Sequence, residues 1–411
     1  MGWGRQQAGV VLPKNVKDAP EKDPRPLTMA EEMKPLLVVM RQIFLMPIHF
    51  PGDGSAKFTL RSGTMYFNYV GCGIFIVDSA QEAVYRMTVL LDCKNFSDAV
   101  FQTFFYILLH THFFTPFLHW PAAPGFVRYL DRWTEFQGRF RRVTGRPLAL
   151  SVRPLALHKS VAALLVPLVL CCITALTMKT ANWKNQPLGW IAAAFQACVP
   201  AFWDVLGTAV VNASTALAGH FREEVTAAGG VPEPSRVRAY RELWLELREL
   251  TEGTTKAWGV CTMHYVLVAT ASVLVAGFGV LAQCTEGISN PILFTVMFLI
   301  SVDSLWHISV LCSAGHRMQG SVGGAARDVL LSMRTSGRAG GPDMELLQSE
   351  VNYFLIVMRK PPVISLYGYI TLKLTLTVTV SNKALRGNYY HHHLLPSGTN
   401  WTNLVPISHQ F

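Results

Sequence analysis

The chain has 411 residues, of which half are hydrophobic and only 15% are charged, and its mean hydropathy is +0.27. Because a soluble domain carries about 25% charged residues, the deficit indicates surface that faces lipid. The formal net charge is +10, but the basic residues lie between apolar runs instead of gathering on one polar face. This arrangement is typical of a membrane protein with basic cytoplasmic loops and argues against nucleic-acid binding.

Residues 1–64 form a mostly polar segment in which no cleavable signal peptide is evident. Their best apolar stretch, 36–46, is interrupted by Arg41 and stopped by Pro47. It is too short to span a bilayer, which takes about 20 apolar residues. We expect this cytoplasmic segment to contain an amphipathic helix on the inner face of the membrane that leads into the first span.

Apolar runs in the rest of the chain predict an all-α, polytopic membrane protein with seven transmembrane helices. The first six spans occupy 65–312 and are expected to form a ligand-binding bundle, and the seventh is short. The first span carries Asp78 and Glu82, and the last contains Lys373. The predicted spans are 65–85, 98–118, 159–178, 188–210, 259–282, 291–312 and 363–380.

The distribution of Lys and Arg predicts the orientation of these spans. The N-terminal segment and the loops 119–158, 211–258 and 313–362 together hold 28, whereas the three alternate loops hold 4. The N-terminus is therefore expected in the cytoplasm and the C-terminus outside. Asn95, in the sequon Asn95-Phe96-Ser97, falls in the first outer loop and is a candidate for glycosylation.

The long inner segments contain helical patterns of their own. Within 236–256, apolar residues recur at spacings of three and four, which predicts an amphipathic helix that continues into the fifth span. Helices four and five are thus expected to extend into the cytoplasm. The segment 320–341 is rich in Gly, Ser and Arg, typical of a flexible linker. An anchor helix over 344–358 follows and ends before Pro361-Pro362.

Polar and aromatic residues inside the spans suggest where a ligand binds. Asp204, Asp303 and His307 lie at membrane depth, where ionisable groups line a pocket or vestibule or form hydrogen bonds between helices. Aromatic side chains are dense in the outer halves of spans two, four and six. They either line an apolar pocket or anchor the helices at the membrane interface. The candidate ligand-binding residues are Phe101, Phe104, Phe105, Tyr106, Trp190, Phe195, Phe294, Phe298, Asp303 and Trp306.

The last span is rich in threonine. Thr371, Thr375 and Thr379 are spaced by four residues and share one face of a helix, with Leu376 beside them. Such a stripe suits a helix that lines a water-filled pore, although threonines also bond to their own backbone in an apolar phase. The sequence offers no metal-type spacing, phosphate loop or paired carboxylates, so no cofactor, metal or enzymatic activity is expected.

Three stretches near the C-terminus resemble insect gustatory receptors. They are Leu305–Arg317 (LWHISVLCSAGHR), Glu350–Leu355 (EVNYFL) and Pro361–Ile370 (PPVISLYGYI). The resemblance implies a plasma-membrane subunit that assembles as a homo- or hetero-tetramer. Each last helix would contribute to a central cation pore, and a small tastant would open it by binding in the outer half of the bundle. Whether that tastant is a sugar, a bitter compound or carbon dioxide stays open.

The C-terminal tail, 381–411, departs from that family. The seventh helix there ends in Thr-Tyr, five apolar residues and Gln-Phe, whereas Val380 is followed here by a polar stretch with three consecutive histidines. Two explanations remain: intron read-through or an alternative last exon. If the tail is genuine, the truncated helix suggests a non-conducting isoform. Two further functions stay open: a G-protein-coupled-type receptor, which would place its N-terminus outside, and a membrane transporter.

Overall fold

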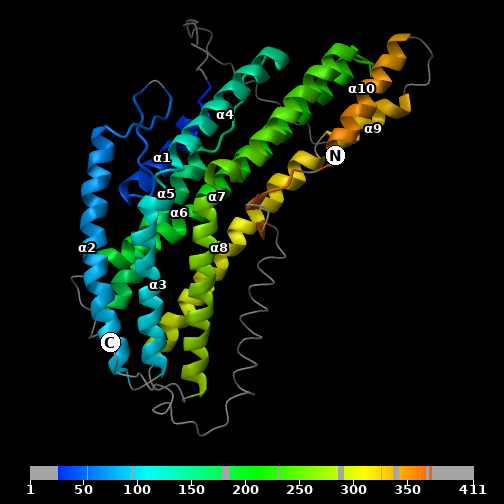
Figure 1. Ribbon diagram of the computed structural model, residues 1–411. Helices are drawn as coiled ribbons and strands as arrows, with labels where there is room; N and C mark the ends of the chain where they lie inside the picture. The colour runs from blue at the N-terminus through cyan, green and yellow to red at the C-terminus, as the bar shows by residue number, and fades with distance from the viewer. Residues whose placement is uncertain are drawn as a thin grey trace, which may run out of the picture.

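The computed structural model describes residues 26–372, except 53, 94–95, 178–185, 230, 286–290, 325, 337–341, 361 and 367–369. The described part is almost entirely helical, as expected (Figure 1). In chain order its elements are α1 (Met29–Gln42), α2 (Gly63–Asp92), α3 (Phe96–Leu118), α4 (Ala123–Thr144), α5 (Arg153–Thr177), α6 (Gln186–Ala227), α7 (Pro234–Thr285), α8 (Pro291–Gly324), α9 (Arg327–Ser336), α10 (Pro342–Met358), β1 (Ser365–Leu366) and β2 (Ile370–Thr371).

The six predicted spans from 65 to 312 correspond to α2, α3, α5, α6, α7 and α8. In the described part, four helices are long and apolar enough to cross a membrane: α5, α6, α7 and α8. Helix α2 contains Asp78, Glu82, Arg86 and Asp92, which lower its hydropathy. It nevertheless leaves a row of large apolar side chains exposed, as expected of a helix in lipid.

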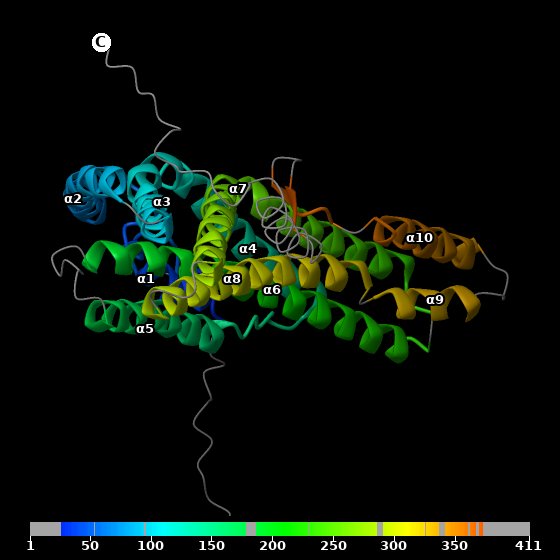
Figure 2. The ribbon, with the colours of Figure 1, turned by 90° about the horizontal axis from the view of Figure 1, so that it is seen from below.

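Helix α6 lies at the centre of the bundle and packs against α3, α5, α7 and α8 (Figures 1 and 2). It meets α8 closely at Gly207, where an added Cβ would lie 3.3 Å from the Cβ of Ala314. Small residues at such a crossing let two helix backbones come together. Because α6 and α8 touch at this point, neither can shift without disturbing the other.

Helix α1 overlaps the apolar stretch 36–46 in which a helix was expected, but it begins earlier, at Met29, and ends at Gln42. Thr28 caps it: its side chain accepts a hydrogen bond from the Glu31 backbone N–H, and the Glu31 carboxylate accepts one from the Thr28 N–H at 2.8 Å. The helix buries the face that carries Met33 and Leu36. It packs mainly against α5, so much of its apolar face meets protein instead of the membrane surface.

Two inner segments differ from the sequence prediction. The loop 119–158 contains α4, which buries Trp133, Phe136 and Phe140 and packs against α7. The supposed linker 320–341 contains the end of α8 and the short helix α9, whose Leu330 is fully buried. Burial of these apolar stripes outweighs the local preference for loop. By contrast, the predicted continuous helix through 236–256 is present in α7, and α10 confirms the helix over 344–358.

The prediction of a helix that starts at 363 is wrong. Ser365 pairs with Thr371 in an antiparallel β1–β2 ladder, and the Leu372 N–H donates to the Ile364 carbonyl at 3.1 Å. Pro361-Pro362 disfavour helix immediately before this segment, and Ile364, Leu366 and Leu372 are fully buried against the bundle. The predicted remainder of this span, 373–380, lies outside the described residues.

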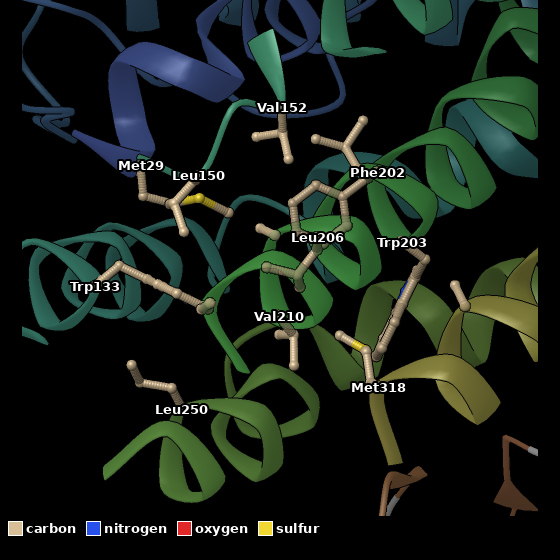
Figure 3. Close-up of a cluster of buried hydrophobic side chains, with 14 of the residues drawn as sticks. Met29, Trp133, Leu150, Val152, Phe202, Trp203, Leu206, Val210, Leu250 and Met318 are labelled. Atoms are coloured by element: carbon tan, nitrogen blue, oxygen red, sulfur yellow. The ribbon is translucent and has the colours of Figure 1, made fainter. Parts of the chain in front are cut away.

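One apolar core joins α1, α4, α6, α7 and α8. Figure 3 shows Met29 and Trp133 on one side of α6 and Met318 beside Trp203 on the other. The Trp203 indole N–H donates to the Thr262 hydroxyl at 2.9 Å, which satisfies its polar atom inside the core. This core holds α6, α7 and α8 as a unit at the end of the bundle where α4 lies.

Candidate ligand site and its link to the last segment

The predicted aromatic residues of α3 have different surroundings. Phe104 is buried, whereas Tyr106 is exposed and packs edge-on against His110. Phe105 is half-buried under the guanidinium of Arg86, 4.6 Å from its ring centre. The side chain of Phe101 lies outside the described part. Of this set, Phe104 is the residue that faces the bundle interior.

Arg86 of α2 connects the charged first span to α3. Its Nε lies 2.5 Å from the Glu82 carboxylate, and its Nη1 donates to the Gln102 side-chain oxygen at 2.8 Å. Glu82 is only 5% exposed, so its charge needs a partner there. Glu82, one of the two acids noted in this predicted span, therefore takes part through Arg86 in a polar bridge between α2 and α3.

On α6, Trp190 and Phe195 both point toward neighbouring helices. The Trp190 indole donates to the Leu164 carbonyl of α5 at 3.1 Å. Phe195 is buried and lines a small cavity with Phe75, Thr111 and His112. The cavity measures about 20 Å³, room for roughly one water molecule. Of the candidate ligand residues, Phe195 is the one that lines this cavity.

The predicted residues of α8 lie along a more open face. Phe294 and Phe298 stack with ring centres 6.4 Å apart, and Phe298 is exposed. Trp306 is 66% exposed and points away from the bundle. The Asp303 Oδ2 lies 3.4 Å from the His307 Nδ1, one helical turn away. The described structure therefore does not bring all the predicted ligand residues to one cavity.

Asp204 joins three helices through two cations. Its Oδ2 lies 2.7 Å from the Lys159 Nζ of α5, and its Oδ1 accepts from the guanidinium of Arg317 on α8. The carboxylate is 15% exposed. Of the two roles considered for Asp204, the structure supports a contact between helices. This contact is a cluster of one carboxylate and two cations, Lys159 and Arg317. The sequence could suggest Asp204, but nothing in it indicated these partners.

A buried pair of histidines was not anticipated from the sequence. His119, just after α3, and His264 of α7 face each other with 3.3 Å between Nε2 and Nδ1. Phe195 and Trp258 pack around His119 at ring-centre distances of 5.3 and 5.7 Å. In the described part, the other nitrogen of each ring has no hydrogen-bond partner. No sequence spacing relates the two residues, which are 145 positions apart.

Tyr129 of α4 fixes the neighbouring part of α7. Its hydroxyl lies 2.9 Å from the Thr254 hydroxyl, and the side chain is buried. Burial raises the pKa of this phenol to about 12, against the smaller opposing effect of the Thr254 hydrogen bond. Tyr129 therefore stays neutral and remains able to donate its proton to Thr254 at physiological pH.

The last described segment is seated directly on α8. A Cβ added to Gly315 would lie 2.8 Å from the Leu372 Cβ and 3.0 Å from its carbonyl oxygen. Contacts this short exclude any larger residue unless the backbone moves. Helix α8 thus runs without a break from Phe294 and Asp303 to the residue on which the last segment rests.

Helix α10 fastens the same region to α7. Arg241 forms an ion pair with Glu350 at 2.8 Å and lies over the Tyr353 ring at 4.5 Å. Phe354 packs edge-on against Trp244 with ring centres 6.2 Å apart. These contacts hold the chain immediately before the last segment. Of the predicted pore residues, Thr371 is half-buried in β2, whereas Thr375, Leu376 and Thr379 lie outside the described residues, as does Asn95.

A comparison with known protein families identifies the family to which this arrangement of helices belongs. The model of the 7tm Chemosensory receptor family matches residues 33–381. The chain belongs to the seven-transmembrane chemosensory receptors. It is therefore a membrane protein and a receptor, not an enzyme, and the resemblance to insect gustatory receptors is confirmed.

Among individual relatives of this chemosensory receptor is Gustatory and odorant receptor 21a of Drosophila melanogaster. It is 23% identical over 363 residues, covering 84% of this chain and 76% of the relative. Gustatory and odorant receptor 22 of Anopheles gambiae is 24% identical over 346 residues, covering 82% and 72%. The match to the family ends at 381, so the atypical tail lies beyond it.

The fold also resembles a solved structure, that of the olfactory receptor OR5 of Machilis hrabei in complex with eugenol. The TM-score is 0.58 at 11% identity, covering 88% of this chain and 98% of OR5. At this identity the likeness shows the fold alone. Together with the family match, this likeness confirms the prediction of an all-α, polytopic membrane protein.

Proposed function

We propose that this receptor is a subunit of a ligand-gated, non-selective cation channel of the plasma membrane, opened by a small tastant or odorant. The ligand binds among α3, α5, α6 and α8, near Phe104, Phe195 and Asp303. The names of the relatives, which pair gustatory with odorant reception, and the eugenol bound to OR5 support a small organic ligand. Four subunits, identical or mixed, surround one pore.

The contact between Gly315 and Leu372 carries this proposal. Helix α8 holds candidate ligand residues near its start and supports the last segment at Gly315, so one rigid element links the two. The Asp204 cluster ties α8 to α5 and α6. A ligand that shifts α8 would therefore displace the last segment, where Thr371, Thr375, Leu376 and Thr379 line the pore.

The test is Gly315→Leu in cells that express the full receptor. A branched side chain at Gly315 cannot fit against Leu372, so currents evoked by an activating odorant should fall at least tenfold while surface expression stays. Gly320→Leu is the matched control, because a Cβ there meets nothing within 4 Å. Normal currents with Gly315→Leu, or an equal loss with Gly320→Leu, would contradict the proposed link.

The orientation with the N-terminus in the cytoplasm belongs to the same proposal. It rests on 28 basic residues in the N-terminal segment and alternate loops, against 4 in the others. Asn95 should then be glycosylated, and a glycosidase should lower the apparent mass of the wild type but not of Asn95→Gln. Absence of the shift, with a tag detected outside the cell at the N-terminus, would reverse the orientation and favour a G-protein-coupled type.

A second candidate, a non-conducting isoform, is favoured by the tail beyond 381. Sequencing the 3′ end of the messenger RNA from a taste organ separates the two. A message that continues past Thr379 into apolar codons supports the channel and marks the tail as intron read-through. A translated tail from Ser381 makes the last span too short for a bilayer and supports the non-conducting form.

A further inference from the structure

A groove with apolar walls and a basic rim runs between α1 and α5, which Figures 1 and 2 both show side by side. Its volume is about 380 Å³, within the range of roughly 300–1,000 Å³ that is typical of ligand sites. The walls come from Pro35 and Val38 of α1 and from Leu157, Val161 and Leu164 of α5. No candidate ligand or pore residue lines it.

Two cations stand among the residues that line the groove, Lys34 on α1 and Arg153 at the start of α5. Both are exposed, and neither forms an ion pair within the described part of the chain. The Lys34 ammonium lies over the Phe50 ring, 5.7 Å from its centre. An anion that reached the groove would therefore meet two unneutralised charges.

An acidic residue of α1 beside the groove, Glu32, already has a hydrogen-bond partner. Glu32 is 5% exposed, and its Oε2 accepts the Arg153 backbone N–H at 2.6 Å, which caps the first turn of α5. That bond ties α1 to α5, so the two walls of the groove keep their spacing without a ligand.

The apolar part of the groove is continuous with the lipid-facing side of α5. Leu157 and Val161 are both about half exposed, and the exposure continues along the same helix at Leu165 and Val169. A hydrocarbon chain could thus enter the groove from the bilayer without crossing polar surface. In the proposed orientation this rim lies at the inner leaflet, whose surface carries anionic lipids.

We propose that the α1–α5 groove binds one anionic phospholipid. Its phosphate contacts Lys34 and Arg153, and one acyl chain lies along Val38, Leu157 and Val161. Basic pockets between helices on the cytoplasmic side of a membrane are suited to such headgroups. Bound there, the lipid would hold α1 against the bundle and fix the entry to the first spans. The assignment to the inner leaflet rests on the proposed orientation; the binding itself is measured without any current.

The experiment is native mass spectrometry of the purified full chain with equal amounts of phosphatidylserine and phosphatidylcholine. Wild type should retain phosphatidylserine preferentially. Lys34→Gln with Arg153→Gln should weaken its binding ~30-fold, which is about 2 kcal/mol for two surface charges. The matched control, Arg128→Gln with Arg142→Gln, removes two exposed charges from α4 and should leave retention unchanged.

A second variant tests the apolar walls. Val38→Trp fills the groove while it keeps both cations, and it should also abolish retention of phosphatidylserine. If this variant binds the lipid as wild type does, the acyl chain lies elsewhere and the groove is not the site. Equal retention by wild type and the Lys34/Arg153 variant would overturn the proposal. Competition by free phosphoserine as strong as that by the lipid would show an anion site instead of a lipid site.

Discussion

Helix α2 and the first half of α7 both carry many apolar side chains, but different surroundings keep these side chains out of water. On α2, Phe67, Val70 and Ile74 are all more than half exposed. On α7, Leu243, Trp244 and Leu247 are buried, and Trp244 contacts α8 and α10. Apolar residues on α2 leave water because lipid surrounds them, whereas those on α7 leave water because other helices do. Side-chain shape should therefore matter much more on α7 than on α2.

Truncation of a tryptophan gives the largest contrast. Trp244 is 1% exposed and donates its indole N–H to the Val322 carbonyl at 3.0 Å. Trp244→Ala should lower the free energy of unfolding by about 3–5 kcal/mol, because it leaves a cavity and an unpaired carbonyl. Trp306→Ala, at an exposed position, should cost under about 0.5 kcal/mol. Thermal midpoints of the purified receptor measure both. Equal losses would mean that Trp306 is covered in the assembled receptor.

Removal of Asp204 should have the next largest effect. Asp204→Ala leaves Lys159 and Arg317 without their shared carboxylate inside the bundle. A fully buried pair would cost about 3–5 kcal/mol, but Arg317 is 43% exposed, and solvent screening lowers the expected loss to about 1–3 kcal/mol. The control is Glu242→Ala, which breaks the exposed Arg238–Glu242 pair and should be nearly neutral. A thermal midpoint unchanged by Asp204→Ala would contradict the importance of the cluster.

Loss of one buried hydrogen bond should be smaller. Tyr129→Phe removes the bond to Thr254 and should cost about 1 kcal/mol at pH 7. Burial raises the Tyr129 pKa to about 12 from 10, so the neutral phenol contributes fully below pH 10. That contribution is lost as the pH rises from 10 to 12, because the unfolded phenol ionises first. Chemical unfolding at pH 7 and pH 11 measures this. A difference between wild type and Tyr129→Phe that stays constant to pH 11 would contradict the shift.

The sequence predicted the helices that depend on local patterns better than the elements that depend on contacts between distant segments. Periodicity over 236–256 predicted the long α7, and the stretch before Pro361-Pro362 predicted α10, since both patterns are local. Helix α4 was missed although its apolar residues recur at helical spacing, because its many arginines suggested a loop when they were counted for orientation. The extended β1–β2 segment was missed because β-branched residues such as Ile364, Ile370 and Thr371 favour a strand but also count toward an apolar span.

The candidate site shows the same division. Asp204 stood out in the sequence as an acid at membrane depth, and Phe195 as one aromatic among several. Their partners did not, because Lys159 and Arg317 lie 45 and 113 positions away along the chain. No spacing pattern in the sequence indicated that His119 and His264 would pair. The sequence could nominate residues of the right chemistry but not say which of them meet.

The sequence by itself determined that the chain belongs in a membrane, where most of its helices lie, and which family it resembles. Those properties depend on the run length and spacing of apolar residues and on short motifs, which act within a few turns. Only the tertiary structure decided that α4 is a core helix, that Gly315 supports Leu372, and that α1 and α5 enclose a groove. Each of these depends on contacts between distant segments, whose free energy appears only when the helices pack together.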